Sequence, residues 1–289
     1  MLDDYPISEL AKESWPKELL EIPQPPETLY IRGKLPAPEF VRLCVVGSRK
    51  YTPYGREACE KLIGELRGHP VCIVSGLALG IDRIAHEAAL KAGLPTIAVP
   101  GSGLDIEVIY PKSNLGLAKD ILKHGGCLLS ELPPKEKATT WTFPQRNRIM
   151  AGLSRAVLII EAEQKSGTLI TSRLATEYNR DVLTVPGSIF SETSKGPLML
   201  LRLGATPVSS GEDILEALGI KTTAEEKQEK LFDDLGEDEK SVCQNIHTPL
   251  SRDELIAVLE WPPSRLNMAL TLLELKGAIK ESTGKVFLA

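Results

Sequence analysis

The sequence predicts an α/β protein with a doubly wound, mostly parallel sheet and a smaller second domain near the C-terminus. Two observations support this fold class. From residue 42 onwards, short apolar segments alternate with longer amphipathic stretches, which is the pattern of strands that alternate with helices. After residue 236, three helical runs are followed by two short strand-like segments, so the order of elements changes there.

The predicted strands are short, continuously apolar and rich in valine and isoleucine. Segments of this kind are typical of strands that helices cover on both faces, because neither side then meets water. The strand segments are 43–46, 71–74, 96–99, 127–129, 156–160 and 182–185. The helix candidates between and after them are 54–67, 80–92, 114–124, 144–152, 168–179 and 198–203. This strict alternation predicts a doubly wound, Rossmann-like parallel sheet.

Composition divides the chain into segments. Residues 1–40 are rich in proline and contain one strand-like run, 29–31, so we expect an extended N-terminal lead-in. Residues 41–219 carry the strand and helix alternation of the Rossmann-like domain. Residues 220–236 are dominated by Glu, Lys, Asp and Gln, which is typical of a charged linker.

The last segment, 237–289, regains apolar residues in a helical pattern. Its predicted helices are 239–246, 251–259 and 264–276, and its predicted strands are 278–281 and 286–288, joined by a turn at 282–285. Three helices closed by a hairpin form a winged helix, a variant of the helix-turn-helix. The presumed recognition helix carries few side chains that read a DNA groove, so a protein-contact role and duplex binding both stay open.

The overall composition is that of a globular protein. Of 289 residues, 42% are hydrophobic, and the longest apolar stretches are too short to span a bilayer, so we expect no membrane contact. The N-terminus is acidic and lacks the features of a signal peptide, which predicts a cytoplasmic protein. The 34 basic and 39 acidic residues give a net charge of -5, so any nucleic acid must bind a local basic patch.

The cysteines and the nucleotide signatures predict no metal and no cofactor. The five cysteines are an odd number and include no pair at the spacing of zinc sites, so we interpret them as reduced core residues. Neither standard phosphate-binding signature for dinucleotides or ATP occurs, so NAD chemistry and ATP hydrolysis are not expected. Asp82 and His86 lie four residues apart on one predicted helix, but no nucleophile can be assigned to them, and we interpret the pair as a structural contact.

Several loops that leave the predicted strands are rich in glycine and polar residues. In a doubly wound sheet these loops lie at the edge where ligands bind. Glycine there lets backbone N–H groups approach an anion such as phosphate, and the following helix adds a partial positive charge. The candidate residues are Gly47, Ser48 and Arg49; Ser75, Gly76 and Gly80; and Lys165, Ser166, Gly167 and Thr168. The alternative for each loop is that glycine serves only a tight turn.

A second basic motif overlaps the start of the helix candidate at 144–152. Its members are Phe143, Arg146, Asn147 and Arg148. Arginine donates forked hydrogen bonds to phosphate, and aromatic rings stack on bases. Lys112 and Asn114 extend the same edge of the sheet and are candidates for a further phosphate contact. The alternative is that the arginines pair with carboxylates such as Glu131, Glu161 or Glu163.

Together these motifs resemble those of the DNA-processing protein A family, also called DprA or Smf. The similarity covers about 42–219 in order and spacing, and the lead-in at 30–33 and the winged helix fit the same family. The motifs that carry the resemblance are Val46-Gly47-Ser48-Arg49, Ser75 to Asp82 with Ala85-His86, Tyr110-Pro111, Phe143 to Arg148, Ser166 to Thr171, and Val185-Pro186-Gly187.

The resemblance implies a non-catalytic protein whose extended Rossmann-like domain binds single-stranded DNA in a basic pocket. It implies that the protein protects incoming DNA, helps to load the recombinase RecA during natural transformation, and forms a homodimer through the last helix and strand of the Rossmann-like domain. The residues that match the family's first phosphate loop are Gly47, Ser48 and Arg49, and those that match its second basic motif are Arg146, Asn147 and Arg148.

Two other classes of function are alternatives. The loop 166–168 partly resembles the phosphate loop of nucleotide phosphoribohydrolases, which are Rossmann-like enzymes, but here Glu177 lies far beyond the loop and the expected double glycine is absent. The other alternative is an interaction scaffold in which the winged helix carries the function. The residues favour the DNA-binding interpretation, because anion loops, forked cations and a nearby ring suit a sugar-phosphate strand with unstacked bases.

Overall fold

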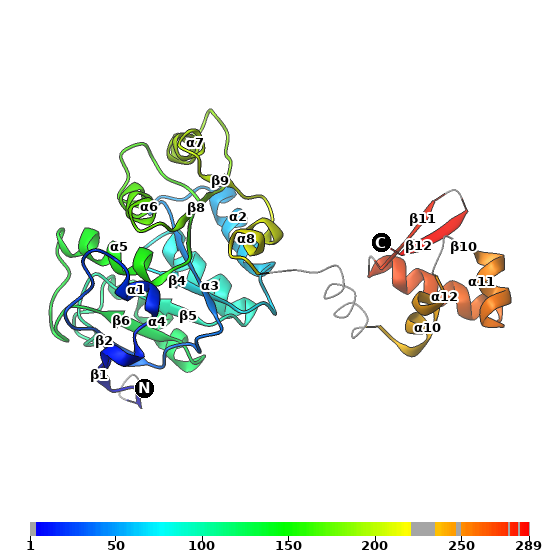
Figure 1. The fold of residues 1–289 in the computed structure, drawn as a ribbon, viewed down its shortest axis with the longest axis horizontal. Coiled ribbons are helices and arrows are strands. Elements are labelled where there is room, and N and C mark those ends of the chain that lie inside the picture. The colour runs from blue at the N-terminus through cyan, green and yellow to red at the C-terminus, as the bar shows by residue number, and fades with distance from the viewer. Residues whose placement is uncertain (1–3, 221–234, 247–249, 277, 283, 289) are drawn as a thin grey trace. The chain divides into compact units, whose positions relative to one another are not determined.

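The computed structural model describes residues 4–220, 235–246, 250–276, 278–282 and 284–288 (Figure 1). The chain divides into two compact units, Met1–Lys221 and Thr222–Ala289. Most of the predicted charged linker lies outside the described residues. Each unit is considered by itself below.

The first unit contains a nine-stranded sheet within its described residues. In chain order the strands are β1 (Ile7–Glu9), β2 (Tyr30–Gly33), β3 (Val41–Val46), β4 (Val71–Ser75), β5 (Thr96–Ala98), β6 (Cys127–Ser130), β7 (Ala156–Ile159), β8 (Asp181–Thr184) and β9 (Thr206–Pro207). Their spatial order is β1-β2-β6-β5-β4-β3-β7-β8-β9. The strands from β6 to β9 pair in parallel, and β1 and β2 add an antiparallel edge. The predicted fold class, doubly wound and mostly parallel, is confirmed.

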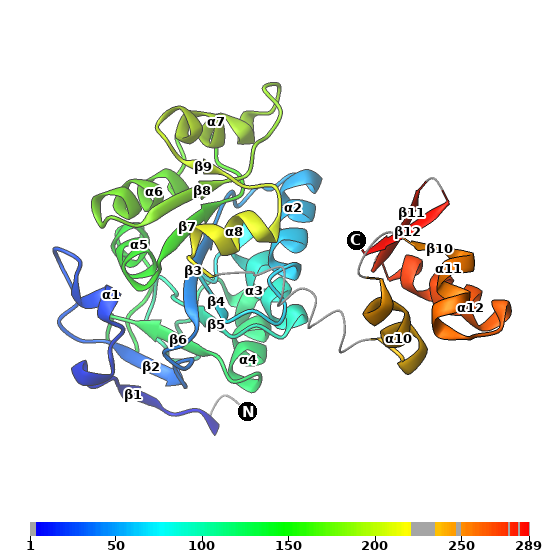
Figure 2. The same cartoon turned by 45° about the vertical axis from the view of Figure 1, so that its right-hand side comes forward.

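Helices cover both faces of this sheet (Figure 2). They are α1 (Lys17–Leu20), α2 (Pro53–Gly64), α3 (Ile81–Ala92), α4 (Leu115–Lys123), α5 (Thr142–Leu153), α6 (Thr168–Glu177), α7 (Lys195–Arg202) and α8 (Gly211–Ala217). Side chains of α2, α3, α4 and α8 pack on one face, and those of α1, α5, α6 and α7 pack on the other. The continuously apolar strands are therefore buried on both sides, as their composition indicates.

The N-terminal lead-in is more ordered than the sequence indicates. β1 pairs with β2 and β2 pairs with β6, so these residues extend the sheet beyond β6. Helix α1 packs on the sheet face that carries α5, through Leu19 and Ile22. The prolines in this region lie outside β1 and β2, where a missing N–H costs no ladder hydrogen bond.

The crevice of the sheet lies between β3 and β7. From β3 the chain winds outward through β4, β5 and β6, and from β7 it winds in the opposite direction through β8 and β9. The loops after β3 and β7 therefore leave the sheet side by side and turn to opposite faces. Ligands of doubly wound proteins bind at such a switch point.

The second unit is a winged helix, as the sequence predicts. It contains α10 (Glu237–Asn245), α11 (Arg252–Leu259) and α12 (Pro263–Leu275), with strands β10 (Leu250–Ser251), β11 (Ile279–Ser282) and β12 (Lys285–Leu288) in the order β10-β12-β11. Its own core includes Val242, Leu255, Leu266 and Val286. The predicted turn at 282–285 contains Thr283, which lies outside the described residues. Among the helices described here, none is long and apolar enough to cross a membrane.

Candidate functional site

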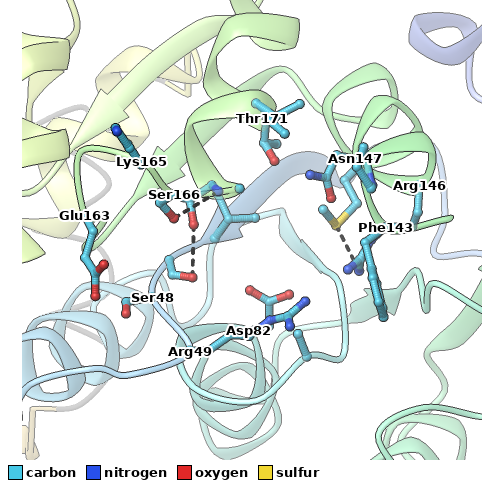
Figure 3. A pocket seen from close by; sticks show the side chains of 18 of the residues that line it. Ser48, Arg49, Asp82, Phe143, Arg146, Asn147, Glu163, Lys165, Ser166 and Thr171 are labelled. Carbon is cyan, nitrogen blue, oxygen red and sulfur yellow. Dashed lines mark hydrogen bonds between the residues drawn. The ribbon is translucent and has the colours of Figure 1, made fainter. Parts of the chain in front are cut away.

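A cavity of about 560 Å³ opens at the switch point between β3 and β7. The loops after these two strands form part of its wall, and the first turns of α5 and α6 complete it. Figure 3 shows Phe143, Arg146 and Asn147 from α5 on one side, Glu163, Lys165 and Ser166 on the other, and Ser48, Arg49 and Asp82 below them. The cavity therefore gathers segments that are distant in the sequence.

Most of the candidate residues line this cavity. They are Gly47, Ser48, Arg49, Phe143, Arg146, Asn147, Lys165, Ser166, Gly167 and Thr168. The candidates that do not line it are Ser75, Gly76, Gly80, Lys112, Asn114 and Arg148. Two of these six, Ser75 and Asn114, support the backbone beneath the cavity through hydrogen bonds. The Ser75 hydroxyl donates to the Val45 carbonyl at 2.7 Å, and the Asn114 amide donates to the Leu77 and Ala78 carbonyls at 2.9 and 3.1 Å.

Two glycines of the loop after β4 have geometric reasons to be glycine. Gly80 has a φ of +82°, in the left-handed region, and a Cβ there would lie 2.3 Å from the Ser48 carbonyl oxygen. A Cβ on Gly76 would lie 1.7 Å from Nη1 of Arg146. The Gly76 N–H donates to Oδ2 of Asp82 at 3.1 Å, so it is not directed at a ligand. Both positions agree with the alternative that glycine here serves close packing.

Arg148 and Lys112 lie away from the cavity. Arg148 forms an ion pair with Glu131 and also donates to the Gln24 carbonyl. This pairing is the alternative that the sequence left open for the arginines. Lys112 is exposed on the short 3-10 helix Lys112–Asn114 that precedes α4.

The cations at the rim of the cavity are accessible. Arg49, Lys50 and Lys165 are all exposed, and within the described residues no carboxylate forms an ion pair with any of them. The Arg49 guanidinium lies 5.2 Å from the ring centroid of Phe143, and the Tyr110 ring lies 6.0 Å from the same ring. The rim therefore presents positive charge next to half-buried aromatic surface.

Arg146 lies deeper than the other cations. It is 6% exposed, and its guanidinium donates to the carbonyl of Val99, the residue that follows β5. The buried carboxylate of Asp82 attracts it across Gly76. Burial lowers the pKa of Arg146 and raises the pKa of Asp82, and each group opposes the shift of the other. This arrangement holds the Arg146 side chain in place beneath the rim.

The two loops that meet at the switch point are joined by hydrogen bonds. The Thr168 hydroxyl donates to the Gly47 carbonyl at 3.1 Å, and the Thr168 N–H donates to the Ser166 hydroxyl at 3.2 Å. Nearby, the buried Glu161 carboxylate accepts from the Thr52 and Thr193 hydroxyls at 2.6 and 2.9 Å. These bonds hold the phosphate-loop candidates in a defined position.

Sequence reasoning missed several residues of the cavity wall. The missed residues are Val46, Lys50, Ala78, Asp82, Thr140, Pro144, Met150, Glu163, Ile170 and Thr171. Asp82 was interpreted as a contact of His86, but the His86 ring instead meets the Thr96 hydroxyl at 2.7 Å, and burial lowers its pKa to about 3. The loop 161–168 contains two acidic residues, and only the structure distinguishes buried Glu161 from cavity-lining Glu163.

The arrangement suits binding of an extended anionic ligand. Exposed cations, hydroxyls and helix N-termini are good donors to phosphate, and Phe143 offers a ring face. The five cysteines are free and buried. In the part of the chain that the structure describes, no cluster of three or more His, Cys, Asp or Glu side chains could hold a metal ion.

The fold and the cavity define a Rossmann-like binding domain followed by a winged helix. Comparison with known proteins makes this class specific: the chain belongs to the DNA recombination-mediator protein A family. The sequence model of that family matches residues 7–219, and the DprA winged helix domain matches residues 231–285. The predicted resemblance is therefore confirmed.

Characterised relatives agree with this assignment. The chain is similar to DNA processing protein DprA of Streptococcus pneumoniae, with 44% identity over 211 residues that cover 73% of each protein. It is 42% identical to protein Smf of Escherichia coli over 71% of this chain, but it spans only 54% of that longer protein.

Two solved structures are similar to this one. The S. pneumoniae DprA structure superposes with a TM-score of 0.68 at 41% identity, over 74% of this chain and 75% of that one. A Helicobacter pylori DprA structure, which describes a single-stranded DNA binding mode of that protein, superposes with a TM-score of 0.66 at 30% identity over 75% of this chain and 98% of that one.

Proposed function

We propose that this protein is a non-catalytic binder of single-stranded DNA and that the strand lies in the cavity between β3 and β7. Phosphates would contact Arg49, Lys165 and the loop at 166–168, and an unstacked base would lie against Phe143. One observation carries the proposal: exposed cations that form no ion pair within the described residues stand next to the half-buried ring of Phe143. A strand with regularly spaced phosphates and free base faces matches both features.

The family supports the same ligand. The H. pylori relative, 30% identical to this chain, is described by its single-stranded DNA binding mode. Of the residues that match the family's first phosphate loop and second basic motif, those that line the cavity are Gly47, Ser48, Arg49, Arg146 and Asn147, and Arg148 does not.

A fluorescence-anisotropy titration of a labelled thymidine oligomer at two salt concentrations tests the proposal. We expect wild-type affinity to fall with salt by about 0.7 log units per phosphate contact for each log unit of salt. Arg49→Glu should weaken binding about 100-fold, because it removes a charge-assisted hydrogen bond worth about 1.5–3 kcal/mol and adds repulsion.

Arg67→Glu is the matched control for this charge reversal. Arg67 is also exposed, but it follows the C-terminal end of α2, away from the cavity, and its side chain donates to the Lys91 carbonyl at 3.1 Å. Its reversal changes the net charge of the protein by the same amount and should alter the affinity little. Salt-independent wild-type binding, or equal losses in the two variants, would contradict the proposal.

We also propose the role that the family resemblance implies: protection of incoming DNA and assistance in loading RecA during natural transformation and recombination, in the cytoplasm. The description of the family as a recombination mediator supports this role. RecA-dependent strand exchange, measured with and without the wild-type protein and with Arg49→Glu, tests it. An effect of wild-type protein that Arg49→Glu retains would contradict a role that depends on the cavity.

Self-association is the remaining part of the proposal, and it involves α7 and β9. In the described residues β9 is an edge strand of the nine-stranded sheet, so its outer side is open to a strand of a second copy. Phe190 and Leu203, which flank α7, are 92% and 76% exposed. We propose that this region forms the homodimer contact. Sedimentation equilibrium of the wild-type protein should give a mass of twice that of the single chain.

The nucleotide-hydrolase alternative has less support. Its expected carboxylate, Glu177, lies at the last residue of α6 and pairs with Arg173 at 3.5 Å, outside the cavity. Incubation with nucleoside monophosphates tests this alternative. Release of free base by wild-type protein would contradict the non-catalytic proposal.

A further inference from the structure

A second cavity lies on the opposite side of α5 from the first. It has a volume of about 430 Å³ and receives Gln145 and Arg148 from α5, whereas Phe143, Arg146 and Asn147 line the first cavity. With about 3.6 residues per turn, these two sets of side chains point in opposite directions from the helix axis. Helix α5 therefore forms a wall shared by both cavities.

The remaining lining comes from the N-terminal segment and from the loop after β6. These residues are Pro25, Glu27, Thr28, Tyr30, Glu131 and Pro133. A third and much smaller cavity shares Gln145 with the second cavity and Arg146 with the first. The two larger cavities are thus neighbours around the first turns of α5.

The charges of the second cavity do not suit a phosphate. The Arg148 side chain is 16% exposed and its charge is balanced by Glu131, which is 11% exposed. Glu27 adds a further carboxylate to the lining. A neutral ligand with hydrogen-bonding groups fits such a lining better than an anion does.

Glu131 offers a hydrogen-bond acceptor in this cavity. One carboxylate oxygen accepts from Arg148, and the other, Oε1, is buried with no hydrogen bond of good geometry among the described residues. The Gln145 side chain also hydrogen-bonds this carboxylate. A ligand that donates a hydrogen bond to Oε1 would add to that contact or replace it.

Aromatic surface accompanies this acceptor. Tyr30 forms part of the cavity wall. Trp141 lies at the N-terminus of α5, four residues before Gln145 and seven before Arg148, so the three side chains follow one stripe of the helix. The Trp141 side chain is 84% exposed, which leaves its ring face open for stacking.

We propose that the second cavity holds a base of the same DNA strand whose phosphates occupy the first cavity, and that Trp141 stacks a base between the two. Glu131 accepts a hydrogen bond from the exocyclic amino group of that base. Cytosine, adenine and guanine carry an exocyclic amino group, whereas thymine carries only carbonyl oxygens as exocyclic polar groups. The site therefore prefers a base with an amino group, such as cytosine, to thymine. This inference rests on the proposed function.

Anisotropy titrations with a length series of labelled thymidine and cytidine oligomers test the inference on the full chain. Trp141→Ala should weaken the binding of long oligomers about tenfold. The affinity for short oligomers, which fill only the first cavity, should not change. Trp141→Phe is the matched control, because it keeps an aromatic face and should retain most of the affinity. Since Trp141 is exposed, neither substitution should change the melting temperature.

Glu131→Gln tests the base preference separately. In this variant the amide oxygen still accepts from Arg148, so the amide nitrogen faces the cavity and offers no acceptor to a base. The protein should then bind long cytidine and long thymidine oligomers equally well. If Glu131→Gln does not fold, the Trp141 variants still test the site.

The outcomes distinguish this inference from the proposed function. If Trp141→Ala binds long oligomers as tightly as wild type and wild type shows no preference for cytosine, the second site is wrong. If Arg49→Glu binds as tightly as wild type, the proposed function is wrong instead.

Discussion

The two units of the chain use the same pair of groups, an arginine over an aromatic ring, in different ways. Arg49 lies 5.2 Å from the ring of Phe143 and has no ion-pair partner in the described part of the chain. In the winged helix, Arg265 lies 4.2 Å from the ring of Trp261 and also pairs with Asp238 at 2.5 Å. The first arginine has a free charge at a cavity, and the second is already neutralised.

Two further cations of the winged helix, Arg252 and Lys276, follow the second pattern. Arg252 pairs with Glu281 and Lys276 pairs with Glu239, both at 2.6 Å. An already paired cation gains little from a phosphate, because the new contact must replace an existing one. If the proposed function holds, residue type alone does not identify a nucleic-acid contact, and the neighbouring carboxylates also have to be considered.

The largest effect on stability should come from filling the space beneath the cavity. In Gly76→Ala, the new Cβ would overlap Nη1 of Arg146 and lie 2.5 Å from Oδ2 of Asp82. We expect a loss of stability of about 1–3 kcal/mol and about tenfold weaker DNA binding, because Arg146 must move. Thermal unfolding and anisotropy measure the two effects.

Gly116→Ala is the control for that substitution. Gly116 lies in α4, and a Cβ there would meet nothing within 4 Å. The variant should bind as wild type and gain up to about 1 kcal/mol from its better helix propensity. Equal behaviour of Gly76→Ala and Gly116→Ala would show that Arg146 does not depend on the space at Gly76.

A smaller effect should appear in the winged helix as a pH dependence. The hydrogen bond from Lys276 and the bond from the Gly236 N–H lower the pKa of Glu239. A carboxylate with a lowered pKa stabilises the fold above its unfolded pKa of about 4.3, and this contribution is lost as the pH falls through the folded value. Glu239→Gln should cost about 1 kcal/mol at neutral pH.

Urea unfolding of the second unit at several pH values measures this effect. The difference between wild type and Glu239→Gln should shrink in acid, below about pH 4. A difference that stays constant from neutral to acidic pH would mean that the ion pair with Lys276 does not account for it.

The smallest effect should come from releasing one cation of the winged helix. Asp238→Asn removes the carboxylate that pairs with Arg265. If ion pairs with carboxylates prevent the cations of this unit from binding phosphate, freeing Arg265 should add at most one phosphate contact. The slope of log affinity against log salt should then steepen by at most about 0.7. A larger increase would contradict the difference drawn between the two units. Strong DNA binding by the winged helix of the wild-type protein would contradict it as well.

Much of the fold follows from the sequence because its strands carry a strong apolar signal. β3, β4 and β7 are buried on both faces and have no polar alternation. β9 has only two residues, Thr206 and Pro207, and β1 lies at an edge with exposed residues, so neither carries such a signal. Their pairing depends on the neighbouring strands, which the local sequence does not encode.

The candidate site was partly predictable for a similar reason. Loops after strands that meet at a switch point lie together, so Ser48 and Ser166 were expected near each other, and both line the cavity. The rotation of α5 about its axis was not predictable. It points Arg146 and Asn147 into the cavity and Arg148 to the other side, although all three belong to one motif.

Photo-crosslinking of a halogenated single-stranded oligomer to the wild-type protein, followed by peptide mapping, tests the central claim most directly. The account predicts adducts on the peptide that contains Phe143, competed by unlabelled oligomer and lost in Arg49→Glu, with little on the peptide that contains Trp261. Adducts confined to the Trp261 peptide would contradict it and would place the DNA contact on the winged helix.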